Sequence, residues 1–309
     1  MHTILGAGGP ISNSLANELI KNGHSIRLVS RSAVTRFPGI EWQGADLKNN
    51  KEVQKAVQGS SVIYMCAGLP YNKKVWAAEW PVIMQNLIDA AQTTGARLIF
   101  FDNVYMYGHV NGSMNENTPY NPLSVKGEIR AKIARKLMDE TLAGNIKASI
   151  ARAADFYGAE SLNSFYDSMV LAKYAKGEKA MWLGNVSKKH AFTYVPDAGK
   201  AMYLLGQTPA SDSQVWHLPT AKAMTGKAFI ELAASTFNRD PRYTTINKFM
   251  LHAIGIFNKL TGETAELYYQ YKYDYIFDSS KFEDTFGLRP TSYNDGVKEL
   301  SKTLFKVKA

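Results

Sequence analysis

Residues 5–12 read Leu5-Gly6-Ala7-Gly8-Gly9-Pro10-Ile11-Ser12 and join the apolar run His2–Leu5 to a segment of helical spacing. Gly6 permits a tight turn after a strand, Gly9 lets the backbone approach a pyrophosphate, and Ser12 is small enough for close helix–strand packing. The helix that follows offers unpaired N–H groups and a positive dipole end to phosphates. A turn with only a structural role is the alternative. We predict that a dinucleotide contacts Gly6, Gly8, Gly9, Pro10, Ile11 and Ser12.

On the C-terminal side of this turn, short apolar runs alternate with longer segments of helical spacing. The runs are almost continuously apolar, as strands buried on both faces of a sheet are. Glycines end several of the helical segments. The alternation predicts an α/β protein with a Rossmann-type doubly wound parallel sheet. The further predicted strands are Ser25–Ser30, Ser61–Cys66, Arg97–Asn103 and Lys147–Arg152.

The second half of the chain is less regular and contains no internal repeat or low-complexity linker. We expect residues 1–158 and 190–218 to form the dinucleotide-binding domain. Residues 159–189 and 219–309 are expected to form a smaller C-terminal substrate-binding region. The predicted helices of this half are Ser161–Lys176, Asp197–Leu205, Thr225–Phe237, Phe249–Leu260 and Ser292–Phe305.

The end of the second predicted strand indicates which dinucleotide is bound. An NAD-preferring site usually has an acidic residue there to accept the ribose 2′-hydroxyl. This chain has Ser30 followed by Arg31, and Arg31 can pair with a 2′-phosphate. We therefore expect NADP rather than NAD, with Arg36 as a further contact. The alternative is that Arg31 only ends a strand in solvent.

Composition limits the classes of protein and partner. The 309 residues include 36 Lys and Arg against 27 Asp and Glu, a net charge of +9, which favours an anionic partner. The single cysteine, Cys66, excludes an intrachain disulfide, and the histidine spacing does not match a zinc hydrolase, so we expect no metal. The sequence has no apolar run of about 18 residues and no signal-peptide pattern, so we expect a cytoplasmic protein.

Two segments are candidates for contact with macromolecules. The lysines between positions 173 and 189 lack a nucleic-acid-binding fold around them, so a solvated surface is the simpler interpretation. The apolar segment 249–257 is expected to cover the substrate pocket or form an oligomer contact rather than lie on a membrane. We expect a small-molecule substrate and a possible homodimer through the helices Val75–Thr94 and Val125–Ala143.

Several motifs, taken in order, resemble those of extended or epimerase-type short-chain dehydrogenases/reductases. The resemblance implies that Asp46 and Leu47 contact the adenine, that the cofactor passes over Cys66, Ala67 and Gly68, and that Ala153 and Asp155 lie beside the nicotinamide. The motifs that carry it, with the Gly6 turn, are Gly44-Ala45-Asp46-Leu47, Cys66-Ala67-Gly68, Asn86–Ala91, Val104–Gly108, Arg152–Gly158, Phe192–Ala198 and Phe286–Thr291.

The catalytic positions depart from the family pattern. The resemblance places Asn103 at the catalytic serine, Lys126 at the tyrosine and Arg130 at the lysine, and Asn103 and Lys126 are also expected to contact the cofactor. Lys126 could donate a proton to a carbonyl oxygen, since Arg130 and partial burial would both lower its pKa. Tyr120 is the first alternative proton donor. A Tyr-x-x-x-Lys at Tyr268 and Lys272 lies outside the expected context and is interpreted as a chance match.

Two functions follow from these expectations. The first is an atypical NADP-dependent oxidoreductase or epimerase/dehydratase-like enzyme that acts on a hydroxyl or carbonyl group of a small polar, sugar-like metabolite. The second is a non-catalytic NADP(H)-binding redox sensor, in which Lys126 and Arg130 only neutralise groups of the cofactor.

Overall fold

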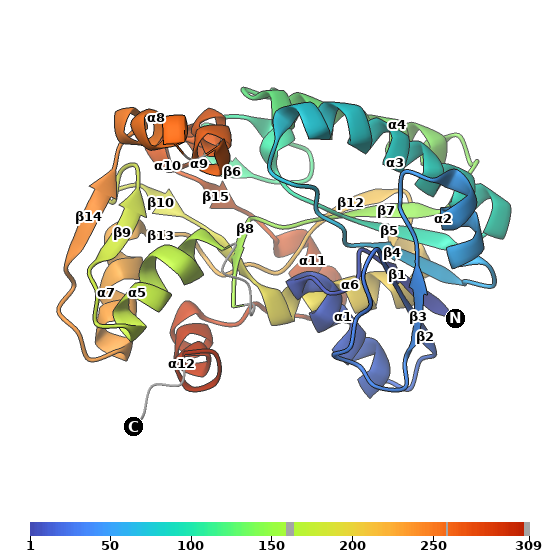
Figure 1. The fold of residues 1–309 in the computed structure, drawn as a ribbon, viewed down its shortest axis with the longest axis horizontal. Coiled ribbons are helices and arrows are strands. Elements are labelled where there is room, and N and C mark those ends of the chain that lie inside the picture. The colour runs from blue at the N-terminus through green and yellow to red at the C-terminus, as the bar shows by residue number, and fades with distance from the viewer. Residues whose placement is uncertain (159–163, 258, 306–309) are drawn as a thin grey trace.

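The computed structural model describes residues 1–158, 164–257 and 259–305. Its centre is a seven-stranded parallel sheet in the order β12-β7-β5-β4-β1-β2-β3 (Figure 1). This arrangement confirms the predicted Rossmann-type α/β fold. The strands are β1 (His2–Leu5), β2 (Ile26–Ser30), β3 (Glu41–Gly44), β4 (Val62–Met65), β5 (Arg97–Asp102), β7 (Ala148–Arg152) and β12 (Gln214–His217).

The strand order reverses at β1. The chain runs from β1 to β2 and β3 on one side, and then crosses to β4 and β5 on the other side. In open parallel sheets the crevice outside the carboxyl ends of the strands at such a point is where ligands bind. The topology therefore places the turn after β1 beside the loop after β4.

Helices cover both faces of the sheet (Figure 1). One apolar core includes residues of α2 (Asn50–Val57), α3 (Lys73–Thr94) and α4 (Val125–Leu142), and the other includes residues of α1 (Pro10–Lys21) and α6 (Val195–Gln207). The helices α1 and α6 cross closely, since a Cβ atom on Gly199 would lie 2.1 Å from Ser14 Oγ. This small contact residue permits near backbone-to-backbone packing.

A second region packs around an aromatic core that includes Tyr166, Trp182 and Phe229. Its short strands pair as β8 (Asp155–Tyr157) with β11 (Phe192–Tyr194), β9 (Ala180–Leu183) with β14 (Tyr243–Ile246), β10 (Lys189–His190) with β13 (Met224–Thr225), and β6 (Ser113–Met114) with β15 (Ile276–Phe277). The remaining helices are η1 (Tyr105–Tyr107), η2 (Asp167–Leu171), α5 (Ala172–Ala175), η3 (Pro209–Ser211), α7 (Gly226–Thr236), α8 (Lys248–Phe257), α9 (Lys259–Thr264), η4 (Ala265–Leu267), α10 (Tyr269–Lys272), α11 (Ser280–Phe286) and α12 (Tyr293–Thr303).

The observed elements differ from the predicted ones where the apolar pattern is weak. The apolar pattern does not predict the strand β3, because it is an exposed, polar edge strand in which even Trp42 is 40% exposed. The predicted helix 249–260 is divided between α8 and α9, and residue 258 lies outside the described residues. The predicted helix 161–176 begins outside them and continues as η2 and α5. Within the described part of the chain, no helix is both long and apolar enough to span a membrane.

Candidate functional site

A cleft of about 1110 Å³ lies at the carboxyl ends of the central strands. Its walls come from the turn after β1, the ends of β2 and β5, the loop after β4, and the helices α3 and α4. Most of the residues that the sequence predicted as cofactor contacts line it. They are Gly6, Gly8, Gly9, Pro10, Ile11, Ser30, Arg31, Asp46, Leu47, Cys66, Ala67, Gly68 and Asn103.

The turn after β1 requires glycine at position 6, because of the backbone conformation and the close contact there. Gly6 has φ +81°, and a Cβ atom there would lie 2.3 Å from Ala67 Cα. Gly9 caps the N-terminus of α1 without a side chain, and Pro10 occupies the first helical turn. The backbone N–H groups at this end are therefore uncovered by side-chain caps, as an anion-binding helix terminus requires. Ser12 is buried and donates from Oγ to Gly9 O over 2.8 Å, so it supports the turn and does not line the cleft.

The outer end of the cleft is lined by basic and small polar residues. Ser30 donates from Oγ to Ser32 O over 2.6 Å and accepts from Trp42 Nε1 at 3.1 Å, which fixes the end of β2. Arg31 is exposed beside it and lines the cleft together with Arg36. The acidic residues at this end are paired with a lysine: Lys48 Nζ lies 3.7 Å from Asp46 Oδ2 and 3.3 Å from Glu79 Oε1.

The inner end of the cleft contains Asn103 and the phenols of Tyr71 and Tyr105. Asn103 Oδ1 accepts from the backbone N–H of Tyr105 at 3.0 Å, which leaves the amide NH₂ group as the donor of this side chain. Tyr71 donates to the hydroxyl of Tyr105 at 3.1 Å. Burial raises the pKa of Tyr105 well above its ordinary value, with a further contribution from Asp155, so the phenol is protonated at neutral pH.

Lys126 lies outside the cleft and is fully buried. Its Nζ donates to Glu263 O at 3.0 Å, to Glu263 Oε2 at 2.6 Å and to Glu266 Oε1 at 2.5 Å. An ammonium group has three N–H donors, so these contacts use all of them. Burial disfavours the charge of Glu263, but the hydrogen bonds from Lys126 and from the backbone N–H of Lys73, together with the charges of both lysines, outweigh it and lower the pKa of this carboxyl. Lys126 thus holds the segment from α9 to η4 against the N-terminus of α4.

The same two glutamates cap both long helices. Glu263 accepts from the backbone N–H of Lys73 at 2.9 Å, and Glu266 accepts from that of Val125 at 2.9 Å. These are the first residues of α3 and α4, where backbone N–H groups lack partners within the helix. Sequence reasoning missed both glutamates, because no local pattern links them to residues that precede them by more than 130 positions.

Arg130 reaches the cleft from the next turn of α4. It is 5% exposed, its Nε lies 2.8 Å from Asp102 Oδ1, and its guanidinium lies 4.3 Å from the ring centroid of Trp80. Arg152, fully buried, approaches the other oxygen of Asp102 at 3.5 Å through Nε. One carboxylate at the end of β5 thus lies between two guanidinium groups.

Tyr120 belongs to a buried network beyond this pair, not to the cleft lining. Arg152 donates to the hydroxyls of Tyr120 and, over 2.7 Å, of Tyr107. The hydroxyl of Tyr107 lies 2.8 Å from His217 Nε2, and His217 Nδ1 lies 2.9 Å from Asp278 O. Because a carbonyl only accepts, Nδ1 is the protonated nitrogen of His217 and Nε2 accepts from Tyr107. Burial, with Arg152 nearby, lowers the pKa of His217 to about 3.

The residues expected beside the nicotinamide are also placed by the structure. Asp155 Oδ2 accepts from Tyr271 at 2.6 Å and lies 3.1 Å from His190 Nε2, and Asp155 is not part of the cleft wall. Ala153 is 1% exposed and packs in the core, while Phe156 lines the cleft. In the Tyr-x-x-x-Lys match, Tyr268 packs beside a small apolar cluster and Lys272 lies 5.0 Å from the ring of Tyr273, away from the cleft.

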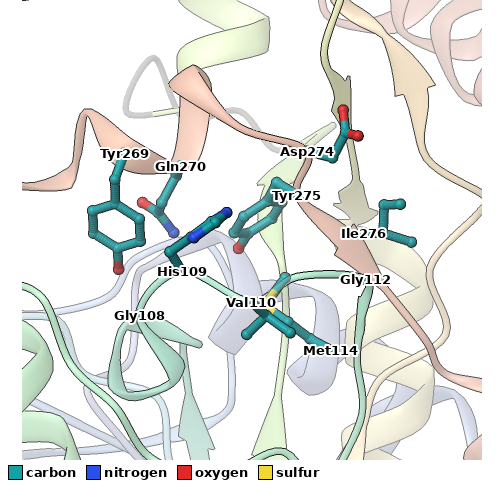
Figure 2. Close-up of a pocket in the computed structure, with 10 residues that line it drawn as sticks. All are labelled: Gly108, His109, Val110, Gly112, Met114, Tyr269, Gln270, Asp274, Tyr275 and Ile276. Atoms are coloured by element: carbon teal, nitrogen blue, oxygen red, sulfur yellow. The ribbon is translucent and has the colours of Figure 1, made fainter.

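A second pocket, between the loop after η1 and the segment from α10 to β15, holds only about 10 Å³ (Figure 2). Figure 2 draws the side chains of His109 and Tyr275 near the centre of the view, between Tyr269 and Ile276. The hydroxyls of Tyr269 and Tyr275, which line it, have no hydrogen-bond partner among the described residues. Its volume is close to the minimum for one water molecule, so we assign no substrate to it.

Comparisons with known proteins agree with this architecture. The NAD dependent epimerase/dehydratase family matches residues 2–218. The fold resembles UDP-glucose 4-epimerase of Thermus thermophilus in complex with NAD, with a TM-score of 0.78, 16% identity, and coverage of 96% of this chain and 97% of that chain. UDP-N-acetylglucosamine 4-epimerase of Bacillus cereus has a TM-score of 0.78 at 14% identity, over 100% of this chain and 97% of that chain.

A curated relative is the mitochondrial NADH-ubiquinone oxidoreductase 40 kDa subunit of Neurospora crassa, 21% identical over 269 residues. The match covers 83% of this chain and spans 66% of that relative's length. The structural likenesses establish only the fold. The family match covers residues 2–218, most of the chain, and therefore establishes the family. The chain belongs to the NAD dependent epimerase/dehydratase family.

Proposed function

We propose that this protein is an NADP-dependent enzyme that acts on a hydroxyl or carbonyl group of a small polar metabolite. The observation that carries the proposal is the single cleft that extends from the Gly6 turn, past Ser30 and Arg31, to Asn103, Tyr105 and Arg130. A dinucleotide at the turn and a reacting oxygen at the inner end would occupy one continuous space. Family membership supports the enzyme class.

The residues at the outer end fit a dinucleotide. Gly6 and Ala67 approach so closely that a Cβ atom on Gly6 would clash with Ala67, and the N–H groups at the start of α1, which no side chain caps, lie at the same turn. Arg31 and Arg36 line the cleft next to Ser30, at the position where a 2′-phosphate requires positive charge. When bound, the nicotinamide ring of the dinucleotide supplies or accepts a hydride.

The chain itself must position the substrate oxygen and move a proton. The amide NH₂ group of Asn103 and the guanidinium of Arg130 are donors at the inner end, and both would stabilise negative charge that develops on a carbonyl oxygen. Both phenols of the cleft are protonated, but Tyr71 donates its proton to the hydroxyl of Tyr105, so Tyr105 is the one whose proton is available to a substrate. We infer that Tyr105, rather than Lys126 or Tyr120, donates the proton, since all three Lys126 donors are already used.

Transfer of deuteride from 4-labelled NADPH across a panel of small carbonyl compounds tests the function. The wild-type protein should label at least one product, and Tyr105→Phe should lower kcat by about 100-fold, since a positioned general acid contributes 10²–10⁴. Tyr243→Phe, in β14 of the second region, is the matched control and should keep full activity. No labelled product from any substrate, with NADPH bound, would overturn the enzyme proposal.

A second candidate function is a non-catalytic NADP(H)-binding sensor. The burial of Lys126 between two glutamates favours it, because the position that resembles the family's catalytic tyrosine has a structural role. This function predicts tight dinucleotide binding, no turnover, and a partner whose affinity differs between the NADP⁺-bound and NADPH-bound protein. The same deuteride assay, run beside calorimetric binding of NADP⁺ and NADPH, separates the two functions.

A further inference from the structure

Two buried guanidinium groups at the inner end of the cleft share one carboxylate. Arg130 is 5% exposed and Arg152 is fully buried. The carboxylate of Asp102 is shared by both, at 2.8 and 3.5 Å. No second carboxylate forms an ion pair with either guanidinium in the described ranges 1–158, 164–257 and 259–305. Two buried cations thus depend on one buried anion.

The contacts of Arg130 are also incomplete as hydrogen bonds. Its Nε and Nη1 atoms are buried and have no hydrogen-bond partner among the described residues, although Nε lies close to Asp102. Burial lowers the pKa of Arg130, and repulsion from Arg152 acts in the same direction. A buried cation with unused donors is costly unless an acceptor from outside the chain completes it. Arg130 lines the cleft, so a ligand there can supply that acceptor.

The walls around Arg130 are flat and aromatic. Tyr105 supplies most of this aromatic surface, because Trp76 and Trp80 are only 5% and 1% exposed in the same wall. The rings of Trp76 and Tyr105 are nearly parallel, at 16° with their centroids 6.4 Å apart. This end of the cleft therefore combines planar apolar surface with one incompletely paired guanidinium.

We propose that the substrate is a small planar metabolite with a carboxylate group, and that Arg130 binds this carboxylate. A carboxylate in the cleft would balance the second buried cation and accept from the guanidinium of Arg130, and arginine is the residue type best suited to such an anion. The ribose hydroxyls and the carboxamide of a dinucleotide are neutral acceptors and would not balance the charge. The inference rests on the proposed function, because it names the substrate class of the same cleft.

Isothermal titration of the NADP⁺-saturated wild-type protein with benzoate and with benzamide tests the proposal. The two probes share a flat ring and differ in charge. A hydrogen bond to a charged acceptor stabilises a complex more than one to a neutral acceptor. We therefore expect benzoate to bind at least about tenfold more tightly than benzamide. Equal affinities, or tighter binding of benzamide, would overturn the proposal without any variant.

Variants assign the preference to Arg130. In Arg130→Met the benzoate-to-benzamide ratio should fall to within about twofold of one, and Arg130→Lys should retain part of it. Arg135→Met removes an exposed arginine from the same helix and should keep the full ratio. If Arg130→Met weakens NADP⁺ binding and leaves the ratio unchanged, Arg130 serves the cofactor and the proposal is wrong.

The two proposals fail in different ways. Absence of NADP⁺ binding to the wild-type protein would overturn the proposed function, and the benzoate-to-benzamide ratio measured on the cofactor-free protein would still test Arg130. Binding of NADP⁺ with no preference for the carboxylate would overturn only the substrate class.

Discussion

The two ends of the cleft are built in different ways. The outer end consists of short consecutive stretches, residues 6–11, 30–36 and 45–48, and much of its shape is backbone. The inner end consists of side chains from distant segments, and Lys126, which is buried outside the cleft one helical turn from Arg130, contacts glutamates 137 and 140 residues away. Backbone geometry at the outer end tolerates little change, whereas side chains at the inner end can be exchanged for others. This difference accounts for a glycine turn that fits the family pattern beside Asn103, Lys126 and Arg130, which depart from it.

The largest effect is expected for Gly6→Val, which disrupts the outer end of the cleft. The residue has φ +81°, and its Cβ atom would meet Ala67 at 2.3 Å. We expect NADP⁺ affinity to fall by more than about 100-fold, because both the turn and the pyrophosphate space are lost. Calorimetric titration with NADP⁺ measures the affinity, after a thermal melt has shown that the variant is folded.

Gly59→Ala is the matched control for this prediction. Gly59 also has a positive φ, +74°, but open space surrounds it. NADP⁺ should bind this variant with wild-type affinity. Equal loss of binding in both variants would show that backbone strain, and not the contact with Ala67, is responsible.

The inner end is tested by removing the partners of Lys126. The double variant Glu263→Gln, Glu266→Gln leaves a buried ammonium without a carboxylate, and we expect the free energy of unfolding to fall by about 3 kcal/mol. Lys126→Met should cost less, since the two glutamates are 18% and 20% exposed and can be hydrated. Urea unfolding of the three proteins measures the difference. A smaller loss in the double variant than in Lys126→Met would contradict the assignment.

The network beneath the inner end predicts a pH effect on stability. The pKa of His217 is about 3 in the folded protein, against about 6.5 when unfolded, and that of His2 is about 4. The unfolded chain therefore binds more protons below pH 6.5, and stability falls from there as the pH decreases. The slope should approach about 1.4 kcal/mol per pH unit for each of these histidines.

Urea unfolding at pH 7.5, 6.0 and 5.0 measures this slope. His217→Gln should be less stable than the wild-type protein at pH 7.5 but should lose less stability on acidification. An unchanged slope in this variant would indicate that His217 is protonated within the fold.

The smallest effect is expected at Arg31. Its side chain is exposed, so solvent weakens the contribution of Arg31 to the binding of a 2′-phosphate. Arg31→Ala should weaken NADP⁺ binding by about tenfold and leave NAD⁺ binding nearly unchanged. The matched control is Arg239→Ala, an exposed arginine in the second region. Equal affinity of the wild-type protein for NADP⁺ and NAD⁺ would remove the argument for NADP.

The sequence was sufficient for five strands of the seven-stranded sheet, all but the edge strands β3 and β12, and for the glycine turn at the outer end of the cleft. Buried parallel strands have continuous apolar runs, and the Gly6 turn is a local motif whose function depends on its neighbours in the chain. The exposed strand β3 has no such run, so it could not be predicted from the apolar pattern.

The inner end could not be predicted because its contacts are long-range. The expectation for Lys126 rested on its place in an order of motifs, and nothing near it indicates Glu263 or Glu266. The sharing of Asp102 by Arg130 and Arg152 likewise depends on how α4 packs over β5 and β7. Ion pairs between distant segments leave no periodic signal in a sequence.

Whether the two ends are functionally separate is tested by the NADP⁺ dissociation constant of Lys126→Met, measured by calorimetry beside the wild-type protein. Lys126 lies outside the cleft and uses its three donors on Glu263 and Glu266, so we predict dissociation constants that agree within about threefold. Loss of NADP⁺ binding in a variant that melts as a folded protein would contradict the account, because it would place Lys126 at the cofactor.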